Sequence, residues 1–195
     1  MILLSAHLDR VIQDYNLQYR HGVHKGLLDN AVGILLTYLT LYDDANLIRL
    51  EKQGRLGIWH GKGEEWAELI DAPPAGRHDF VIVIDVAAGR QYRNMDFGLE
   101  NIAGVKPATI KHIQEVLEWE GMRVRVKKYN GDPEDADEAW QWRNKNVPVL
   151  SFIVPIRAKR DGWHRVQQDN TVSAETILTC RQGLKRLINI LLEDE

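Results

Sequence analysis

The sequence predicts an α/β fold, in which strands and helices alternate along the chain and build a layered sheet. Short apolar runs recur between segments of helical periodicity, and the clearest run, FVIVIDV at 80–86, is apolar without alternation. A strand has this pattern when both faces of its sheet are covered, and alternating strands and helices favour a sheet with helical layers. Because the chain shows no repeat, low-complexity tract or linker, we expect one domain over residues 1–195.

The composition is that of an ordinary globular protein, with 44% hydrophobic residues, 27% charged residues and a net charge of −3. No block of like charge predicts a nucleic acid or membrane partner. The single cysteine, Cys180, excludes an internal disulfide and is expected to be a small core residue. The apolar start MILLSA is too short for a signal peptide, and no run is long enough to span a membrane. We therefore expect a cytoplasmic protein.

The residues before the strand at 80–86 are expected to contain three further strands and two helices. Residues 2–6 have the pattern of a buried strand, and residues 30–44 that of a buried helix. Residues 46–52 and 54–61 are strand candidates joined by a turn at Gln53-Gly54, because glycine favours turns. EEWAELI at 64–70 indicates a short helix.

The alternation continues after the strand at 80–86. Pro107 near the start and Gly121 at the end indicate a helix over 107–121. The next segment, 122–129, alternates like a half-exposed strand. A helix at 133–146 and a strand at 147–156 follow, and the last helix, 174–195, has an apolar face at helical spacing.

Polar residues follow several of the predicted strands. In open α/β sheets, ligands bind beyond the carboxyl ends of the strands, so these positions are candidates for a site. The residues that follow the strands or precede the first long helix are His7, Asp9, Asp29, Glu64, Glu65, Asp85 and His164. We expect them to converge at one edge of the sheet.

Imidazole and carboxylate groups are the ligands that zinc accepts. Two zinc ions held close together need shared ligands, and a carboxylate can bridge them. Asp9, two residues after His7, is placed to accept the second ring N–H of that histidine. The adjacent Glu64 and Glu65 can divide the work, since one can bind metal while the other stays free as a base.

Taken singly, these residues have ordinary structural explanations. Acidic residues at a helix start, such as Glu64 and Glu65, complement the helix dipole, and Asp29 is a normal N-cap residue. Asp85 is harder to explain, because an unpaired carboxylate that closes a buried strand is costly. The occurrence of all of these residues in order at predicted strand ends favours a site with two metal ions. Among the other histidines, His60 is the one expected to line the cleft.

The order of these residues resembles that of the dinuclear zinc exopeptidases, the aminopeptidase and carboxypeptidase superfamily. That family has a strand followed by His-x-Asp, a bridging Asp before a helix of small residues, Glu-Glu, an Asp at a strand end, and a late His. This chain contains SAHLDRV, GLLDNAVG, GKGEEWAEL, VIVIDVA and RDGWHRV in that order. The resemblance covers residues 2–188 and is closest to the lid-less, single-domain aminopeptidases. It implies a three-layer αβα sandwich around a mostly parallel mixed sheet.

The resemblance also implies roles for the candidate residues. It implies two Zn²⁺ ions, with Co²⁺ or Mn²⁺ as alternatives. The metal ligands would be His7 and Asp85 on one side, Glu65 and His164 on the other, and Asp29 as the bridge. Glu64 would be the general base, and Asp9 would orient His7. The implied function is hydrolysis of an amide bond, with a peptide or small amide as the substrate and a peptide N-terminus as the preferred position.

Two alternatives remain open. The first is a deacylase or carboxypeptidase of the same superfamily, because the metal ligands do not separate these activities. The second is a non-catalytic binding or assembly module, with a homo-oligomer as one form. It is motivated by a departure from the family: relatives carry a helix and a strand hairpin before the His-x-Asp strand, and this chain begins at that strand. An N-terminally shortened sheet exposes an edge that can pair with a partner.

Overall fold

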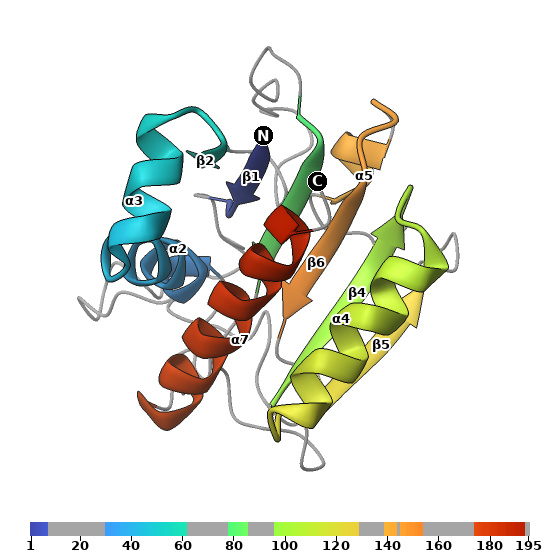
Figure 1. The fold of residues 1–195 in the computed structure, drawn as a ribbon. Helices are drawn as coiled ribbons and strands as arrows, with labels where there is room; N and C mark the ends of the chain where they lie inside the picture. Colours follow the sequence, from blue (N-terminus) through green and yellow to red (C-terminus); the bar gives the residue numbers. More distant parts are fainter. Residues whose placement is uncertain are drawn as a thin grey trace, which may run out of the picture.

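The computed structural model describes residues 1–7, 30–61, 78–85, 96–128, 139–143, 145–153 and 174–193. In these residues a six-stranded mixed sheet has the strand order β2-β1-β3-β6-β4-β5 (Figure 1). The strands are β1 (Ile2–Ser5), β2 (Leu56–Trp59), β3 (Phe80–Asp85), β4 (Phe97–Ala103), β5 (Val124–Lys128) and β6 (Val149–Ile153). β1, β2, β3 and β6 run parallel, whereas β4 is antiparallel to β6 and parallel to β5.

Helices cover both faces of this sheet. They are α2 (Val32–Tyr42), α3 (Ala45–Lys52), α4 (Pro107–Trp119), α5 (Ala139–Arg143) and α7 (Ala174–Glu193). Side chains of α2, α3, α4 and α7 share one core cluster with Ile82 and Ile84 of β3, while α5 packs against Val81 and Val83 on the other face. The α/β prediction of a three-layer arrangement with a mostly parallel mixed sheet is therefore confirmed. No helix in the described ranges has the length and apolarity of a membrane span.

The two-sided burial of β3 explains its uninterrupted apolar sequence. All six of its residues are buried, and successive side chains enter opposite cores because side chains alternate along a strand. Each fully buried Val, Ile or Phe side chain contributes about 1.5–3 kcal/mol relative to an exposed one. The sequence predicted the other main elements as well: β1, β2, β5, β6, α4 and α7 all fall within the expected segments. Cys180 lies in the α7 core, as expected.

The prediction of a strand at 46–52 is wrong, because this segment forms α3. Asp44 caps the helix by accepting hydrogen bonds from the backbone N–H groups of Asn46 and Leu47, at 2.8 and 3.2 Å. Leu47 and Leu50 are the buried residues of α3, and their spacing of three suits a helix face rather than a strand. A hydrogen bond from Lys185 of α7 holds the pKa of Asp44 below its ordinary value. The turn at Gln53-Gly54 is present and connects α3 to β2.

Strand β4 has no counterpart in the sequence-based prediction. Its sequence, FGLENIA, carries Glu100 and Asn101 in the middle, and these polar residues interrupt the apolar pattern. Asn101 has a positive φ of 49°, and the pairing register of β4 shifts with both neighbours at this point. A local irregularity of this kind is typical of a β-bulge. The strand is fixed by long-range packing, which includes the stacking of Phe97 on Phe152 at 4.6 Å between ring centroids.

The expectation for residues 30–44 is correct for the helix and wrong for its burial. Helix α2 forms, but only one of its faces is covered, and four large apolar side chains of the other face are exposed. The predicted helix at 64–70 lies outside the described residues, and the helix predicted at 133–146 is described as Ala139–Arg143.

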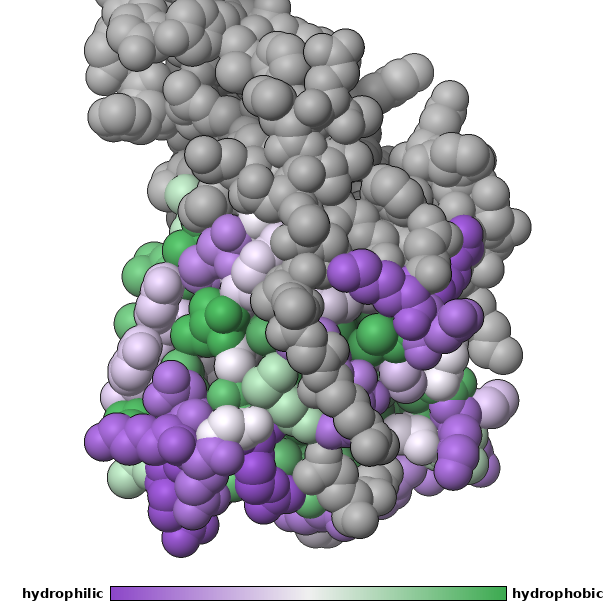
Figure 2. Space-filling view, turned by 90° about the horizontal axis from the view of Figure 1, so that it is seen from above, coloured by the Kyte–Doolittle hydropathy of each residue, from purple (hydrophilic) through white to green (hydrophobic). Residues whose placement is uncertain are grey.

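Figure 2 looks down on the molecule from above the view of Figure 1 and shows hydrophilic side chains interspersed with smaller apolar areas.

We expect Gly183→Ala to destabilise the fold. A Cβ atom at this position of α7 would lie 2.4 Å from Cε1 and 2.6 Å from Cζ of Phe97. Alanine gains about 1 kcal/mol over glycine in helix propensity, but overpacking a core costs about 1–3 kcal/mol. Urea unfolding should therefore give a lower free energy for this variant, whereas Gln182→Ala, at an exposed neighbouring position, should not lower it. Equal or greater stability of Gly183→Ala would contradict the close packing described here.

Candidate functional site

The site is defined by the edge at which the parallel strands end. His7 lies two residues beyond β1, and Asp85 is the last residue of the neighbouring strand β3. The β1–β3 register pairs Ile2 with Phe80, and continuing it brings His7 level with Asp85. Side chains that are level on adjacent strands point to the same face, so these two meet. Nε2 of His7 lies 3.4 Å from Oδ1 of Asp85, and their side chains are only 2% and 9% exposed.

This distance suits two chemical roles. It is longer than the usual 2.7–3.2 Å of an N–H···O hydrogen bond, so the pair forms at most a weak one. Ligand atoms at about 2.0–2.1 Å from one tetrahedral zinc ion are separated by about 3.4 Å. The His7 and Asp85 atoms therefore have the spacing of two ligands of the same ion. A buried imidazole and carboxylate are also the donor types that zinc accepts.

Asn30 fixes the start of α2 to the end of β3. Its side-chain amide donates a hydrogen bond of 2.7 Å to the carbonyl oxygen of Ile84, the residue before Asp85. Its Oδ1 atom is buried and accepts no hydrogen bond in the described part of the chain. Gly33 makes room for this arrangement, because a Cβ atom there would lie 2.1 Å from Oδ1 of Asn30. The small residues at the start of α2 therefore allow the helix to approach the strand end next to Asp85.

His60, which follows β2, lies on the opposite face of the sheet from Asp85. When the β1–β2 register is continued by one residue, His60 is level with Ala6, which lies in the core shared with α2. The His60 ring contacts the ring of Tyr38 in α2, with centroids 5.5 Å apart. Its Nδ1 atom lies 3.0 Å from the carbonyl oxygen of Ala6 and must carry the proton of that hydrogen bond. Burial lowers the pKa of His60 and so favours the neutral form of its ring. His60 thus links β1, β2 and α2.

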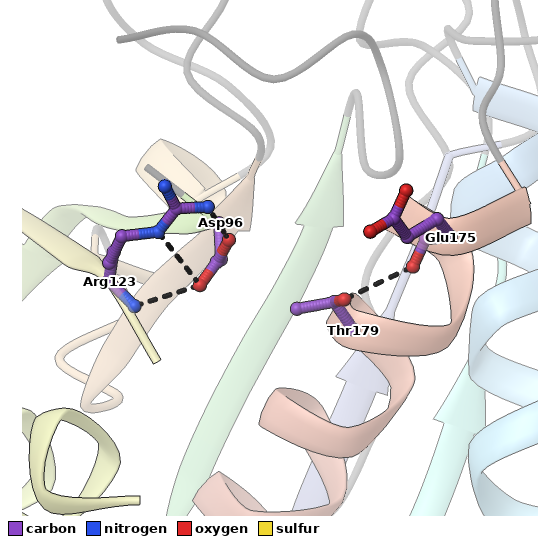
Figure 3. A network of polar contacts seen from close by, with 4 residues as sticks. All are labelled: Asp96, Arg123, Glu175 and Thr179. Atoms are coloured by element: carbon purple, nitrogen blue, oxygen red, sulfur yellow. Dashed lines mark hydrogen bonds and ion pairs between the residues drawn. The ribbon is translucent and has the colours of Figure 1, made fainter. Parts of the chain in front are cut away.

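A second polar group lies at this edge, and sequence reasoning missed it. Because β4 runs antiparallel to β6, the amino ends of β4 and β5 lie beside the carboxyl end of β6. Asp96 and Arg123 precede these two strands and form an ion pair (Figure 3). Arg123 donates through Nη2 to Oδ1 at 2.5 Å and through its backbone N–H to Oδ2 at 2.9 Å. No sequence signal pointed to the pair, because β4 itself was not predicted.

The charge of Asp96 is stabilised by its partner. Burial raises the pKa of this carboxyl group, but the hydrogen bonds and positive charge of Arg123 outweigh burial and hold the pKa below its ordinary value. The same contacts raise the pKa of Arg123. Figure 3 shows the pair across from the first turn of α7, where Thr179 donates a hydrogen bond of 3.1 Å to the carbonyl oxygen of Glu175. Charged side chains thus flank the edge on which His7 and Asp85 meet.

Of the residues predicted from the sequence, the structure brings His7 and Asp85 together. The others lie outside the described residues and stay predictions: Asp9, Asp29, Glu64, Glu65 and His164. In the described part of the chain, no group of three or more His, Cys, Asp or Glu side chains could hold a metal ion. The pair is therefore the described portion of the candidate site.

Comparison with known proteins shows the fold. No family model and no curated protein matches the sequence. Solved structures that it resembles include the zinc aminopeptidase BSAP of Bacillus subtilis (TM-score 0.59, 10% identity). A glutaminyl cyclase of Tannerella forsythia (0.59, 16%) and the gamma-secretase component nicastrin (0.65, 15%) are also similar. The α/β fold is therefore the one that aminopeptidases and glutaminyl cyclases share.

These similarities cover nearly all of this chain but differ in how much of the other protein they cover. The matches include 96% of this chain with the aminopeptidase and 97% with each of the other two. The chain spans 45% of the aminopeptidase, 40% of nicastrin and 72% of the glutaminyl cyclase. It thus corresponds to less than half of two of these proteins.

We expect the Asp96–Arg123 pair to make stability depend on acid pH. The folded pKa of Asp96 is lowered, so its contribution is full above the ordinary carboxyl pKa of about 3.9 and is lost as the pH falls through the lower folded value. In Asp96→Asn, the free energy of unfolding should fall less steeply as the pH is lowered. Urea unfolding at pH values between about 7 and about 3, a range that includes the ordinary carboxyl pKa, measures this difference. Glu115→Gln, at an exposed position of α4, is the control, and equal pH dependence of Asp96→Asn and the unmodified protein would contradict the assignment.

Proposed function

We propose that this protein is a metal-dependent hydrolase that cleaves an amide bond, with a peptide N-terminus as the preferred position. The observation that carries the proposal is the buried His7–Asp85 pair, whose 3.4 Å spacing fits two ligands of one zinc ion at the edge where α/β proteins bind ligands. The shared fold of a zinc aminopeptidase supports the same function. The proposed substrate is a peptide or a small amide.

Two zinc ions would need more ligands than this pair supplies. We assign Asp29, Glu65 and His164 to complete the set, with Asp29 as the bridge. The position of Asn30 supports the role of Asp29. Asn30 directly follows Asp29 in the sequence, and its side chain is hydrogen-bonded to Ile84, the neighbour of Asp85. The likeness of Glu64-Glu65 and the late His164 to the exopeptidase motifs supports the rest of the set. Co²⁺ and Mn²⁺ are alternatives, since they accept the same nitrogen and oxygen ligands.

The roles of the protein groups follow from the chemistry of amide hydrolysis. Bound zinc supplies a Lewis acid for the amide carbonyl and lowers the pKa of water. Glu64, as the general base, takes the proton of the attacking water and passes it to the leaving amine. Asp9 accepts the second ring N–H of His7 and so fixes its orientation. His7 then presents Nε2, the atom that faces Asp85 in the structure.

Related amide chemistry is the nearest alternative. A deacylase or carboxypeptidase would use the same metal ligands. A glutaminyl cyclase is a further alternative, because the match to this chain includes a larger share of the cyclase than of the aminopeptidase or nicastrin. A panel of aminoacyl, N-acetyl, C-terminal and N-terminal glutaminyl substrates separates these activities. Turnover of the aminoacyl compounds supports the proposed peptidase, whereas exclusive turnover of another class reassigns the substrate.

A non-catalytic module is the alternative from a different class. Two observations favour it: nicastrin, a component of gamma-secretase, has a similar fold, and α2 exposes an apolar face that suits an interaction. Metal content discriminates the two classes. About two zinc ions per chain after metal-replete purification support the hydrolase, and none supports the module.

We expect Asp85→Asn to lose zinc while the fold is retained. The change removes a charged ligand without changing the size of the side chain, so zinc affinity should fall more than about tenfold. Asp96→Asn is the matched control, because it makes the same change at the same edge on a residue that pairs with Arg123. Elemental analysis and a competition titration with a chelator measure the effect. Equal zinc affinity of the two variants would exclude Asp85 as a ligand.

The adjacent glutamates give a second test. Glu64→Gln should keep its zinc and lose about 10²–10⁴-fold in turnover, because the proton acceptor is removed while the ligands remain. Glu65→Gln should lose zinc as well as activity. Zinc content and steady-state kinetics on an aminoacyl amide separate the two effects. Full activity of Glu64→Gln would show that the assigned base is wrong.

A further inference from the structure

Helix α2 carries an exposed apolar stripe that the proposed hydrolysis does not use. The stripe consists of Leu35, Tyr38, Leu39 and Tyr42, which are 45%, 41%, 37% and 57% exposed. Their spacing of three, one and three residues places them on one side of the helix, as in the contact seam of paired helices. The stripe is therefore a continuous ridge and not a set of scattered residues.

The composition of α2 is unusual for a helix at the surface. Its sequence, VGILLTYLTLY, contains no charged residue, and its inner face is buried in the core through Val32, Leu36 and Leu41. A surface helix normally carries polar and charged residues on its outer face, and a helix that is apolar on all sides is normally covered on all sides. An exposed ridge of this kind marks an interaction surface.

The ridge is ordered before any partner binds. The Tyr38 and Tyr42 rings stack with centroids 5.9 Å apart and planes 8° apart, and Tyr38 also contacts the ring of His60. Thr37 is bonded back to the carbonyl oxygen of Gly33 at 2.9 Å, which keeps its hydroxyl off the surface. Association therefore costs little side-chain entropy at the two tyrosines, and this cost is one of the main terms that oppose binding.

We propose that the stripe binds the same stripe of a second copy of this chain. In an antiparallel, two-fold arrangement, Leu35 of one copy faces Tyr42 of the other, and Tyr38 faces Leu39, so each leucine meets an aromatic ring. Such an interface is self-complementary, as a two-fold dimer requires. This inference does not depend on the proposed amide hydrolysis.

Charge at the end of the stripe is compatible with this pairing. Asp43 pairs with Arg181, and Asp44 pairs with Lys185 at 2.5 Å, so the acids after α2 are neutralised within the chain. Two copies can then approach without repulsion between these carboxylates. The absence of Lys and Arg from α2 argues against a membrane surface, which attracts amphipathic helices with basic residues.

The exposed side chains supply the apolar centre of the proposed dimer interface. Such an interface buries about 800 Å² on each partner, with apolar and aromatic residues at its centre and a polar rim. Two tyrosines and two leucines per copy, each at least 37% exposed, form the apolar centre. Asp43, which follows Tyr42, and its partner Arg181 of α7 provide polar residues for the rim.

Light scattering and sedimentation of the full chain over a range of concentrations test the proposal. We expect a dimer for the unmodified protein and at least a tenfold weaker association for Leu39→Glu and Tyr42→Glu. Trp119→Gln is the control, because Trp119 is 89% exposed on α4, outside the stripe. Circular dichroism of each variant shows whether its fold is kept. A monomer at all concentrations, or a dimer that Leu39→Glu leaves unchanged while folded, would overturn the proposal.

A cross-linking experiment does not depend on the charged variants. Leu39→Cys lies near the expected two-fold axis and should form a disulfide-linked dimer under mild oxidation, while Cys180 stays buried. Trp119→Cys, with a more exposed thiol, should cross-link much less. Equal cross-linking of the two variants would place the contact elsewhere and exclude the stripe as the interface.

Discussion

The parallel pairing of β1 with β3 is the constraint on which the candidate site depends. A constant offset between the two strands brings Ile2 level with Phe80 and, at the other end, His7 level with Asp85. A shift of this register by one residue would turn one of these side chains to the opposite face of the sheet. The apolar cores on both sides of β3 hold the register, because a shift would send each side chain of the strand into the opposite core, which is packed around different residues. Packing that is remote from the polar edge therefore determines the distance between the imidazole and the carboxylate.

The sequence predicted the elements whose burial is simple and failed where long-range contacts decide. β3 could be recognised because its residues are buried on both sides, and α7 because its apolar face repeats at helical spacing. β4 could not be recognised, since Glu100 and Asn101 interrupt it and its place in the sheet depends on Phe152 and Gly183. The strand predicted at 46–52 failed for a local reason: the cap formed by Asp44 and the helix-forming residues of the segment favour a helix.

The candidate site shows the same division. His7 and Asp85 could be predicted to lie at the same edge of the sheet, because both stand at the ends of predicted strands, and the resemblance to the zinc exopeptidases implied that they meet. The Asp96–Arg123 pair could not, because its position follows from the reversal of β4. The face on which His60 lies was also beyond a sequence argument, since the register of β2 decides it. Residue type and order thus predict which groups a site can contain, whereas strand direction and register determine which of them meet.

Helix α2 connects the sheet edge that carries His7 and Asp85 with the apolar stripe. At the start of the helix, Asn30 is hydrogen-bonded to the strand end beside Asp85. The outer side of the helix carries the apolar stripe. Any partner that immobilises this helix also restrains the amide of Asn30, and any ion that tightens the strand end restrains the helix in return. Thermodynamic linkage makes such an effect reciprocal: the partner would change the affinity for the ion by the same factor by which the ion changes the affinity for the partner.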